Sequence, residues 1–376
     1  MHRTQRLSQT LEKHIFPLVF ALTFPLFYLR GQNYNAKLLG DDAELMAHAL
    51  NRVPPFGYFS SLDSWGLLDP FNGYLAVYLR LITKLVLLMG DESFIPHTFW
   101  VMSVYWSVIS GLLAYTIKRF AGAAVGCAAG FVLAVMPYSN LAMLAQVNTI
   151  AWPACLLTLI VVGTREYPLR RFSKLVLLLL FAGTAASTGA AIVTVAVLGI
   201  NVLRHREKCL SFEQLLFACT ASGFALQYLS FTPRDNPSVP LIPEILKISF
   251  GFAPQSIRAQ ILQPLSSWQN FILYVTPIVF FLCIGLLCYF SFHSNQKRVL
   301  VGVQFIGEGM FLVLLLTTAN GWLNSHYLFI PTALLWIGVI LIGSVSIRNR
   351  RWSEFVLLVI AAGILLMGIS GTYFVT

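Results

Sequence analysis

The chain has 376 residues, of which 57% are hydrophobic and only 11% are charged, and its mean hydropathy is +0.74. A water-soluble domain of this length has too little polar surface to cover so much apolar material, so the composition excludes an ordinary soluble fold. The net charge of +10 would suggest nucleic-acid binding in a soluble protein, but most basic residues here stand in short clusters between apolar runs, where they orient membrane helices.

Apolar runs long enough for membrane-spanning helices follow one another along the chain. They predict an all-α polytopic membrane protein of about 9–11 transmembrane helices, organised as a single domain over residues 1–376. No small-residue cleavage pattern follows the first run, so we interpret it as a retained span. The runs cover residues 15–29, 73–89, 98–117, 121–138, 147–163, 175–203, 212–229, 271–292, 299–318, 327–345 and 355–374.

Basic clusters separate these runs, and the positive-inside rule assigns all of them, and the N-terminus, to the cytoplasm. The rule is met if residues 73–89 do not cross the membrane but either lie along its outer surface or dip in and return, and we interpret them as a juxtamembrane helix. Residues 175–203 must then form a hairpin that enters and leaves from the cytoplasm, broken in the small and polar stretch 183–189. Residues 30–97 and 230–269 become the two large outer loops. The clusters are Arg3/Arg6/Lys13, Lys118/Arg119, Arg165/Arg170/Arg171/Lys174, Arg204/Arg206/Lys208, Lys297/Arg298 and Arg348/Arg350/Arg351.

An acidic run, Asp41, Asp42 and Glu44, follows the first apolar run in a chain that otherwise carries few charges. Such residues are typical of a helix N-terminus, where they cap free N–H groups and complement the helix dipole. They are equally suited to accept a proton from an attacking hydroxyl, or to hold a metal ion that activates it. Both interpretations stay open, because a helix N-terminus also holds a catalytic carboxylate in place.

Arg80 and Lys84 are four residues apart, so a helix presents them on one face. One interpretation is that their long side chains reach toward lipid headgroups from the membrane surface. The other is that the two cations, beside an acidic outer loop, bind a phosphate group.

Residues 41–47, Asp-Asp-Ala-Glu-Leu-Met-Ala, resemble the acidic signature of the GT-C superfamily of membrane glycosyltransferases, in which such a pair opens a helix in the first outer loop. Residues 69–75, Asp-Pro-Phe-Asn-Gly-Tyr-Leu, continuing to Arg80, are similar to the aromatic juxtamembrane segment of aminoarabinose transferase and protein mannosyltransferases. The resemblance covers residues 1–150. It implies a GT-C-like bundle, a polyprenyl-phosphate sugar donor, Asp41 as the base with Asp42 as second choice, and Arg80 and Lys84 on the donor phosphate.

Seven further residues are candidates for lining the cavity. Each has an alternative role in helix packing, in a solvated face or as an interfacial anchor. Glu308 lies within a span between two glycines, and an intramembrane carboxylate is itself a functional hypothesis. No second Asp-x-Asp motif follows, so the sequence supports neither a metal site nor a cofactor. The seven candidates are Glu44, Tyr74, Asn148, Trp152, Arg258, His326 and Tyr327.

These patterns predict a glycosyltransferase that moves a sugar from a polyprenyl-phosphate-linked donor to a hydroxyl of a glycan or lipid acceptor, outside the inner (cytoplasmic) membrane. We expect the lipid bilayer, the donor and the acceptor as its partners, and no nucleic acid. The alternative is a transporter or flippase for a lipid-linked or anionic solute, with the broken run 175–203 as the moving element. A membrane acyltransferase is less favoured, because the histidines are scattered in loops and termini.

Overall fold

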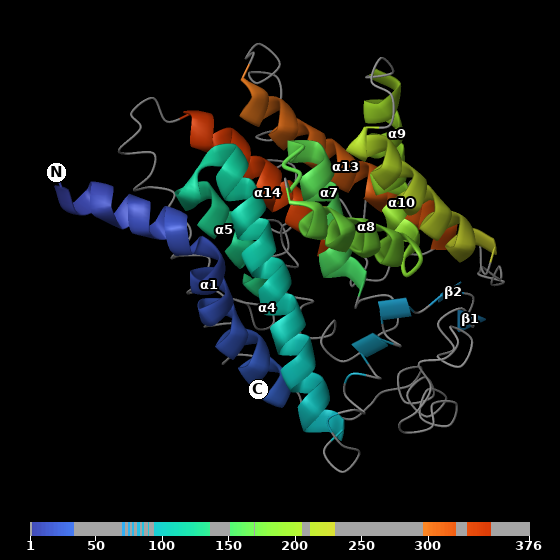
Figure 1. The fold of residues 1–376 in the computed structure, drawn as a ribbon, viewed down its shortest axis with the longest axis horizontal. Coiled ribbons are helices and arrows are strands. Elements are labelled where there is room, and N and C mark those ends of the chain that lie inside the picture. The colour runs from blue at the N-terminus through green and yellow to red at the C-terminus, as the bar shows by residue number, and fades with distance from the viewer. Residues whose placement is uncertain are drawn as a thin grey trace, which may run out of the picture. The chain divides into compact units, whose positions relative to one another are not determined.

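The computed structural model describes residues 2–33, 70–71, 74–75, 77–78, 81–82, 85, 89, 94–135, 151–168, 170–204, 211–229, 296–320 and 329–346 (Figure 1). These residues are helical apart from turns, short connections and one pair of two-residue strands, which confirms the predicted helical class. The helices are α1 (His2–Asn33), α4 (Phe94–Ala121), α5 (Ala123–Val135), α7 (Ala151–Thr164), α8 (Arg171–Ala185), the 3₁₀ helix η2 (Gly189–Ala191), α9 (Ile192–Arg204), α10 (Phe212–Leu229), α13 (Lys297–Asn320) and α14 (Phe329–Ser346).

The chain divides into two compact units, each built from several chain segments. The first unit consists of Met1–Leu26, Ser110–Ser139 and Asn236–Thr376, and the second of Phe27–Ile109 and Asn140–Asp235. Each unit is described by itself below.

Among the described helices, the segment Phe99–Ala121 is long and apolar enough to cross a membrane by itself. The bent pair Arg171–Ala185 and Gly189–Arg204 meets the same criterion when its two helices are taken together. Four shorter apolar helical segments are present in the described part of the chain: Lys13–Leu29, Ala123–Ala134, Ala151–Thr164 and Phe329–Val345.

In the first unit, α4 and α5 form a helical hairpin that turns at Gly122. Its φ of 99° lies in the left-handed region that glycine adopts without steric cost. Gly126 and Gly130 then let the backbone of α5 lie against α4: a Cβ on Gly126 would stand 2.5 Å from the carbonyl oxygen of Ala114. Glycines four residues apart at a helix contact are typical of closely packed membrane helices.

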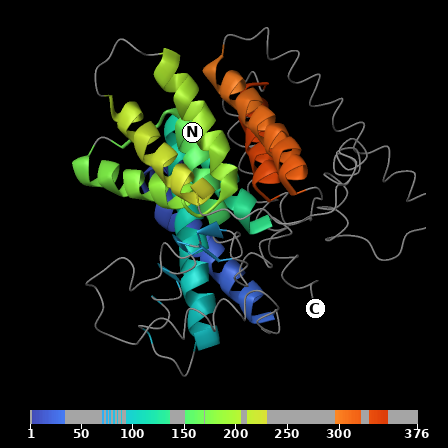
Figure 2. The same cartoon turned by 90° about the vertical axis from the view of Figure 1, so that its right-hand side faces the viewer.

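The α13 and α14 helices form a second close pair in the first unit (Figure 2). A Cβ on Gly302 would lie 2.8 Å from the carbonyl oxygen of Gly338, and one on Gly309 would lie 2.9 Å from that of Pro331. The helices are antiparallel, because Gly302 faces Gly338 whereas Gly309, further along α13, faces the earlier Pro331. Glycine therefore permits close backbone contact here too.

Two of the basic clusters meet in the first unit. The ammonium group of Lys297, at the start of α13, lies 5.4 Å from the ring centroid of Phe120. Phe120 directly follows the basic pair Lys118 and Arg119 at the α4–α5 turn. The two clusters thus lie on one side of the unit, which is the arrangement that the topology prediction requires.

The second unit contains a bundle of α7, α8, α9 and α10 (Figure 1). The α10 helix packs against both α8 and α9, and α7 packs against the same two helices. Gly223 of α10 lies against the backbone of α8, where a Cβ would overlap the carbonyl oxygen of Ala182. The hydroxyls of Thr158 and Thr194 meet at 3.2 Å and link α7 to α9.

The α8 helix ends at Ala185. The helical segment that follows, Gly189–Arg204, makes an angle of 119° with α8. Two hydroxyls bond back to carbonyls one turn earlier: Thr184 donates to Leu180 at 2.7 Å and Ser187 to Gly183 at 2.7 Å. The Thr188 side chain accepts a bond from the next helix start, at Ala190 N–H. Such local bonds compete with helix continuation, so the helix breaks within the predicted stretch 183–189.

The Gly223 contact yields a stability prediction. Gly223→Ala should lower the free energy of unfolding by about 1–3 kcal/mol, because the added methyl forces α10 away from α8. Gly307→Ala is the matched control, since Gly307 is also helical but has open space around its Cβ position. Thermal unfolding of the purified variants measures both. Equal melting temperatures for the two variants would contradict the close contact of α10 with α8.

Candidate functional site

The predicted catalytic and phosphate-binding residues, Asp41, Asp42, Arg80 and Lys84, lie outside the described residues. Two of the cavity-lining candidates are within them. Tyr74 belongs to strand β2 (Tyr74–Leu75), and Trp152 is buried in the first turn of α7. The other five candidates also lie outside the described residues: Glu44, Asn148, Arg258, His326 and Tyr327.

The predicted juxtamembrane helix starts later than residue 73. Strand β1 (Pro70–Phe71) pairs with β2 in antiparallel fashion, and Phe71 faces Tyr74. The intervening dipeptide Asn72-Gly73 is the sequence preferred in two-residue hairpin turns. Among the described residues of this segment, the first helical one is Val77. The predicted helix start at residue 73 is therefore wrong, because Tyr74 and Leu75 pair with Pro70 and Phe71 as a strand.

Tyr78, next in this segment, is bonded to the break after α8. Its hydroxyl donates to the carbonyl oxygen of Leu180 at 2.8 Å and lies 3.0 Å from the hydroxyl oxygen of Thr184. Its backbone N–H donates to the hydroxyl of Ser187 at 3.3 Å. The absence of a side chain at Gly183 leaves room for the tyrosine, since a Cβ there would stand 3.3 Å from the Tyr78 hydroxyl. The segment that carries Arg80 and Lys84 in sequence is thus attached to the apex of the broken helix.

This contact is far from the basic start of α8. Leu180 follows Arg171 by nine residues, which corresponds to about 14 Å along a helix that rises 1.5 Å per residue. Ser187 lies beyond the end of the same helix. Tyr78 therefore meets the bundle near the apex, at the opposite end of α8 from its basic residues.

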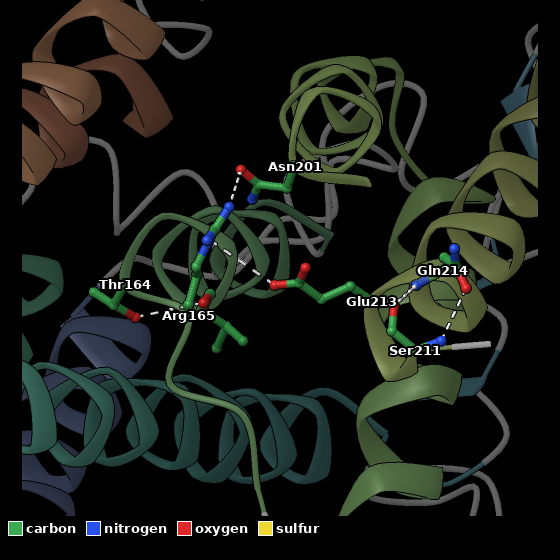
Figure 3. A network of polar contacts seen from close by, with 7 residues as sticks. Thr164, Arg165, Asn201, Ser211, Glu213 and Gln214 are labelled. Atoms are coloured by element: carbon green, nitrogen blue, oxygen red, sulfur yellow. Dashed lines mark hydrogen bonds and ion pairs between the residues drawn. The ribbon is translucent and has the colours of Figure 1, made fainter. Parts of the chain in front are cut away.

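At that other end, Arg165 connects three helices (Figure 3). It directly follows α7, donates from Nη2 to Asn201 Oδ1 of α9 at 2.8 Å, and places Nε 3.9 Å from Glu213 Oε1 of α10. Arg165 has a φ of 58°, a left-handed conformation that costs a non-glycine residue about 1–2 kcal/mol. The contacts of its side chain with α9 and α10 hold it there.

The start of α10 carries a reciprocal cap beside this arginine (Figure 3). Ser211 N–H donates to the side-chain oxygen of Gln214 at 2.8 Å, and Gln214 N–H donates to the Ser211 hydroxyl at 3.4 Å. This is a capping box, and the Ser-x-x-Gln pattern that predicts it is readable in the sequence. It places Glu213 in the first turn, where a carboxylate suits the helix dipole.

Aromatic contacts add the start of α8 to the same end of the bundle. The ring of Tyr167 meets that of Phe212 edge-on at 5.7 Å, and the ammonium of Lys174 lies 5.1 Å from the Phe212 centroid. Burial raises the pKa of Tyr167, and the nearby Glu213 carboxylate raises it further, so this phenol stays neutral.

The contacts of Arg165, Asn201, Glu213 and Lys174 bring together the end of α7, the start of α8, the end of α9 and the start of α10. The broken helix therefore leaves and returns to the same end of the bundle, as expected for the predicted hairpin. The residues that join these ends are 36 or more positions apart, so no local pattern in the sequence indicates their pairing.

A further polar group lies in the first unit. Glu308 of α13 is 7% exposed and accepts a bond from the side-chain amide of Gln304, one turn earlier, at 2.6 Å. Its second carboxylate oxygen has no hydrogen-bond partner among the described residues. The part of the chain that the structure describes contains no group of three histidine, cysteine or carboxylate side chains able to hold a metal ion.

The contact at the apex yields a second stability prediction. Tyr78→Phe should lower the free energy of unfolding by about 1 kcal/mol, because it removes the hydroxyl that bonds to α8. In a double-mutant cycle with Thr184→Val, the two changes should be less than additive. Tyr228→Phe is the matched control, since that tyrosine is 71% exposed. The contact would be contradicted if the losses of unfolding free energy were additive. It would also be contradicted if the Tyr78→Phe variant were as stable as the control.

Comparison with known proteins adds no family to this description. No family model matches the chain, and no curated protein is detectably similar to it.

Proposed function

We propose that the chain is a polytopic membrane glycosyltransferase with a GT-C-like bundle. In this proposal it takes a sugar from a polyprenyl-phosphate donor outside the inner membrane and transfers it to a hydroxyl of a glycan or lipid acceptor. The resemblance of residues 41–47 and 69–80 to GT-C enzymes is its starting point.

One structural observation carries the proposal. Tyr78 is bonded to the apex of the α8–α9 hairpin, whereas the basic residues around α8 and α9 gather at the other end of the bundle. If the basic end faces the cytoplasm, the segment of Arg80 and Lys84 lies toward the outer side. That is the side on which the acidic run after the first span is expected.

The helix contacts support a membrane setting. Glycines bring α4 against α5, α13 against α14 and α8 against α10, which suits helices that associate in lipid by close packing. The basic start of α13 also lies beside the basic α4–α5 turn, as a common cytoplasmic side requires.

In the proposed reaction, Asp41 accepts the proton of the acceptor hydroxyl, with Asp42 as second choice. The hydroxyl oxygen bonds to the anomeric carbon of the sugar while the bond between that carbon and the phosphate oxygen breaks. The lipid phosphate leaves with its negative charge and needs no general acid. Arg80 and Lys84 stabilise that charge.

A second candidate, a transporter or flippase for a lipid-linked or anionic solute, is favoured by two observations. The bent helix pair α8–α9 resembles the discontinuous helices that transporters use. Glu308 is a buried carboxylate within an apolar helix, a kind of residue that often marks an ion or proton pathway.

One assay separates the two functions. Purified full-length protein is incubated in detergent, without a gradient, with a radiolabelled polyprenyl-phosphate sugar and candidate glycan and lipid acceptors. The transferase predicts a covalently labelled acceptor and free lipid phosphate. Movement of the labelled lipid across reconstituted vesicles, with no covalent product, would instead establish the transporter.

A further inference from the structure

One face of α8 carries an exposed apolar stripe. Phe172, Leu175, Val176 and Leu179 stand at positions i, i+3, i+4 and i+7, so they share a face of the helix. Their exposed fractions are 76%, 53%, 48% and 64%. Other faces of α8 pack against α7 and α10. A contiguous apolar face of this kind requires an apolar partner.

Two cations stand at the N-terminal end of this stripe. Arg170 and Arg171 are both exposed, and the Arg170 side chain makes no capping bond to α8. Within the described ranges, neither guanidinium group forms a hydrogen bond or an ion pair. The α8 and α9 helices contain no acidic residue, and the Glu213 carboxylate faces Arg165. The stripe therefore ends at two arginines whose charges are available to an anionic group.

The exposed stripe is short enough to fit within one leaflet of a bilayer. From Phe172 to Leu179 the helix rises about 10 Å, at 1.5 Å per residue. One leaflet contributes about 15 Å of the roughly 30 Å hydrocarbon core. Beyond the stripe, the Tyr78 hydroxyl bonds to the Leu180 carbonyl and contacts the Thr184 hydroxyl. The exposed apolar surface thus extends from the cations over a length that a single acyl chain covers.

We propose that this face of α8 binds an anionic phospholipid of the surrounding bilayer, with its headgroup phosphate at Arg170 and Arg171 and an acyl chain along Phe172 to Leu179. Charge complementarity selects an anionic headgroup, and the adjoining apolar stripe selects a lipid over a soluble anion. The inference uses the membrane setting proposed above but not the transferase chemistry.

The test uses full-length protein reconstituted in phosphatidylcholine bilayers that contain trace spin-labelled phosphatidylglycerol or phosphatidylcholine. Electron spin resonance measures the fraction of each lipid immobilised by the protein. The wild type should prefer phosphatidylglycerol, and the double variant Arg170→Gln/Arg171→Gln should reduce that preference by up to about 5-fold for each charge removed. The double variant Phe172→Ala/Leu179→Ala should release both lipids. Sugar transfer should be unchanged in the arginine variant, so loss of the lipid site and loss of the proposed activity are distinguishable.

Arg119→Gln is the matched control, because Arg119 is an exposed arginine at the end of another helix, α4. It should keep the wild-type preference. If the arginine variant does not reconstitute, about 1 M salt should abolish the preference of the wild type by screening. The proposal is overturned if neither the arginine substitutions nor salt reduces the preference for phosphatidylglycerol. It is also overturned if Phe172→Ala/Leu179→Ala alters only the oligomer size, since the stripe would then contact another copy of the chain.

Discussion

Asp41→Asn should slow sugar transfer by at least about 100-fold, the loss expected when a positioned general base is removed. The amide is nearly the same size as the carboxylate and retains its carbonyl oxygen as a hydrogen-bond acceptor, so the variant should stay folded. It cannot take the proton of the acceptor hydroxyl. The rate is measured with the radiolabelled donor at saturating acceptor, and Asp42→Asn identifies which carboxylate is the base.

Asp91→Asn is the matched control, because Asp91 lies in the same predicted outer loop but away from the acidic run. It should transfer sugar at the wild-type rate. If Asp41→Asn and Asp42→Asn both kept full activity, the proposed base would be excluded, whatever the identity of the sugar.

Neutralising the two cations should have the second largest effect. A hydrogen bond to a charged group contributes about 1.5–3 kcal/mol, so Arg80→Gln and Lys84→Gln should each lower kcat/KM by roughly 10- to 150-fold. A larger effect on kcat than on KM indicates that the cation stabilises the departing phosphate. A change confined to KM would show that it only binds the donor.

Arg52→Gln serves as the control for charge alone, since Arg52 lies in the same predicted outer loop. It should leave kcat/KM close to the wild-type value. An equal decrease of kcat/KM in Arg52→Gln, Arg80→Gln and Lys84→Gln would indicate general attraction of an anionic lipid. It would contradict a specific phosphate site.

Much of the described helical framework was predictable from hydropathy and charge. The predicted run 212–229 coincides with α10, and the predicted runs 299–318 and 327–345 lie within two residues of α13 and α14 at each end. The break after α8 was predictable because glycines and hydroxyl residues interrupt an otherwise apolar run. Hydropathy averaged over a window of residues identifies long apolar segments, so it locates such helices well.

Contacts between distant residues were not predictable in the same way. Tyr78 bonds to residues more than 100 positions away, and Arg165 meets Asn201 and Glu213 across separate helices. Such pairs depend on how the helices are rotated and packed, and neither is encoded in local spacing. The strand pair around Asn72 is a different case, since its turn chemistry is local and readable.

Of the proposed site, the sequence predicted the residue types and their chemistry but not the attachment of the Arg80 segment to the hairpin apex. That attachment is made by the hydroxyl and the backbone N–H of Tyr78, and it needs the lack of a side chain at Gly183. Gly183 belongs to the stretch that predicts the helix break, but nothing in the local sequence indicates that it faces Tyr78. Their roles become apparent only when the two segments lie side by side.

Labelling of single cysteines tests the account most directly. In a background without the six native cysteines, Asp41→Cys, Lys84→Cys and Arg119→Cys variants are treated in intact cells with a membrane-impermeant maleimide. The carboxylates and cations share an extracytoplasmic pocket in our account, so positions 41 and 84 should react from outside and position 119 only after permeabilisation. Reaction of positions 41 and 84 from opposite faces of the membrane would contradict it.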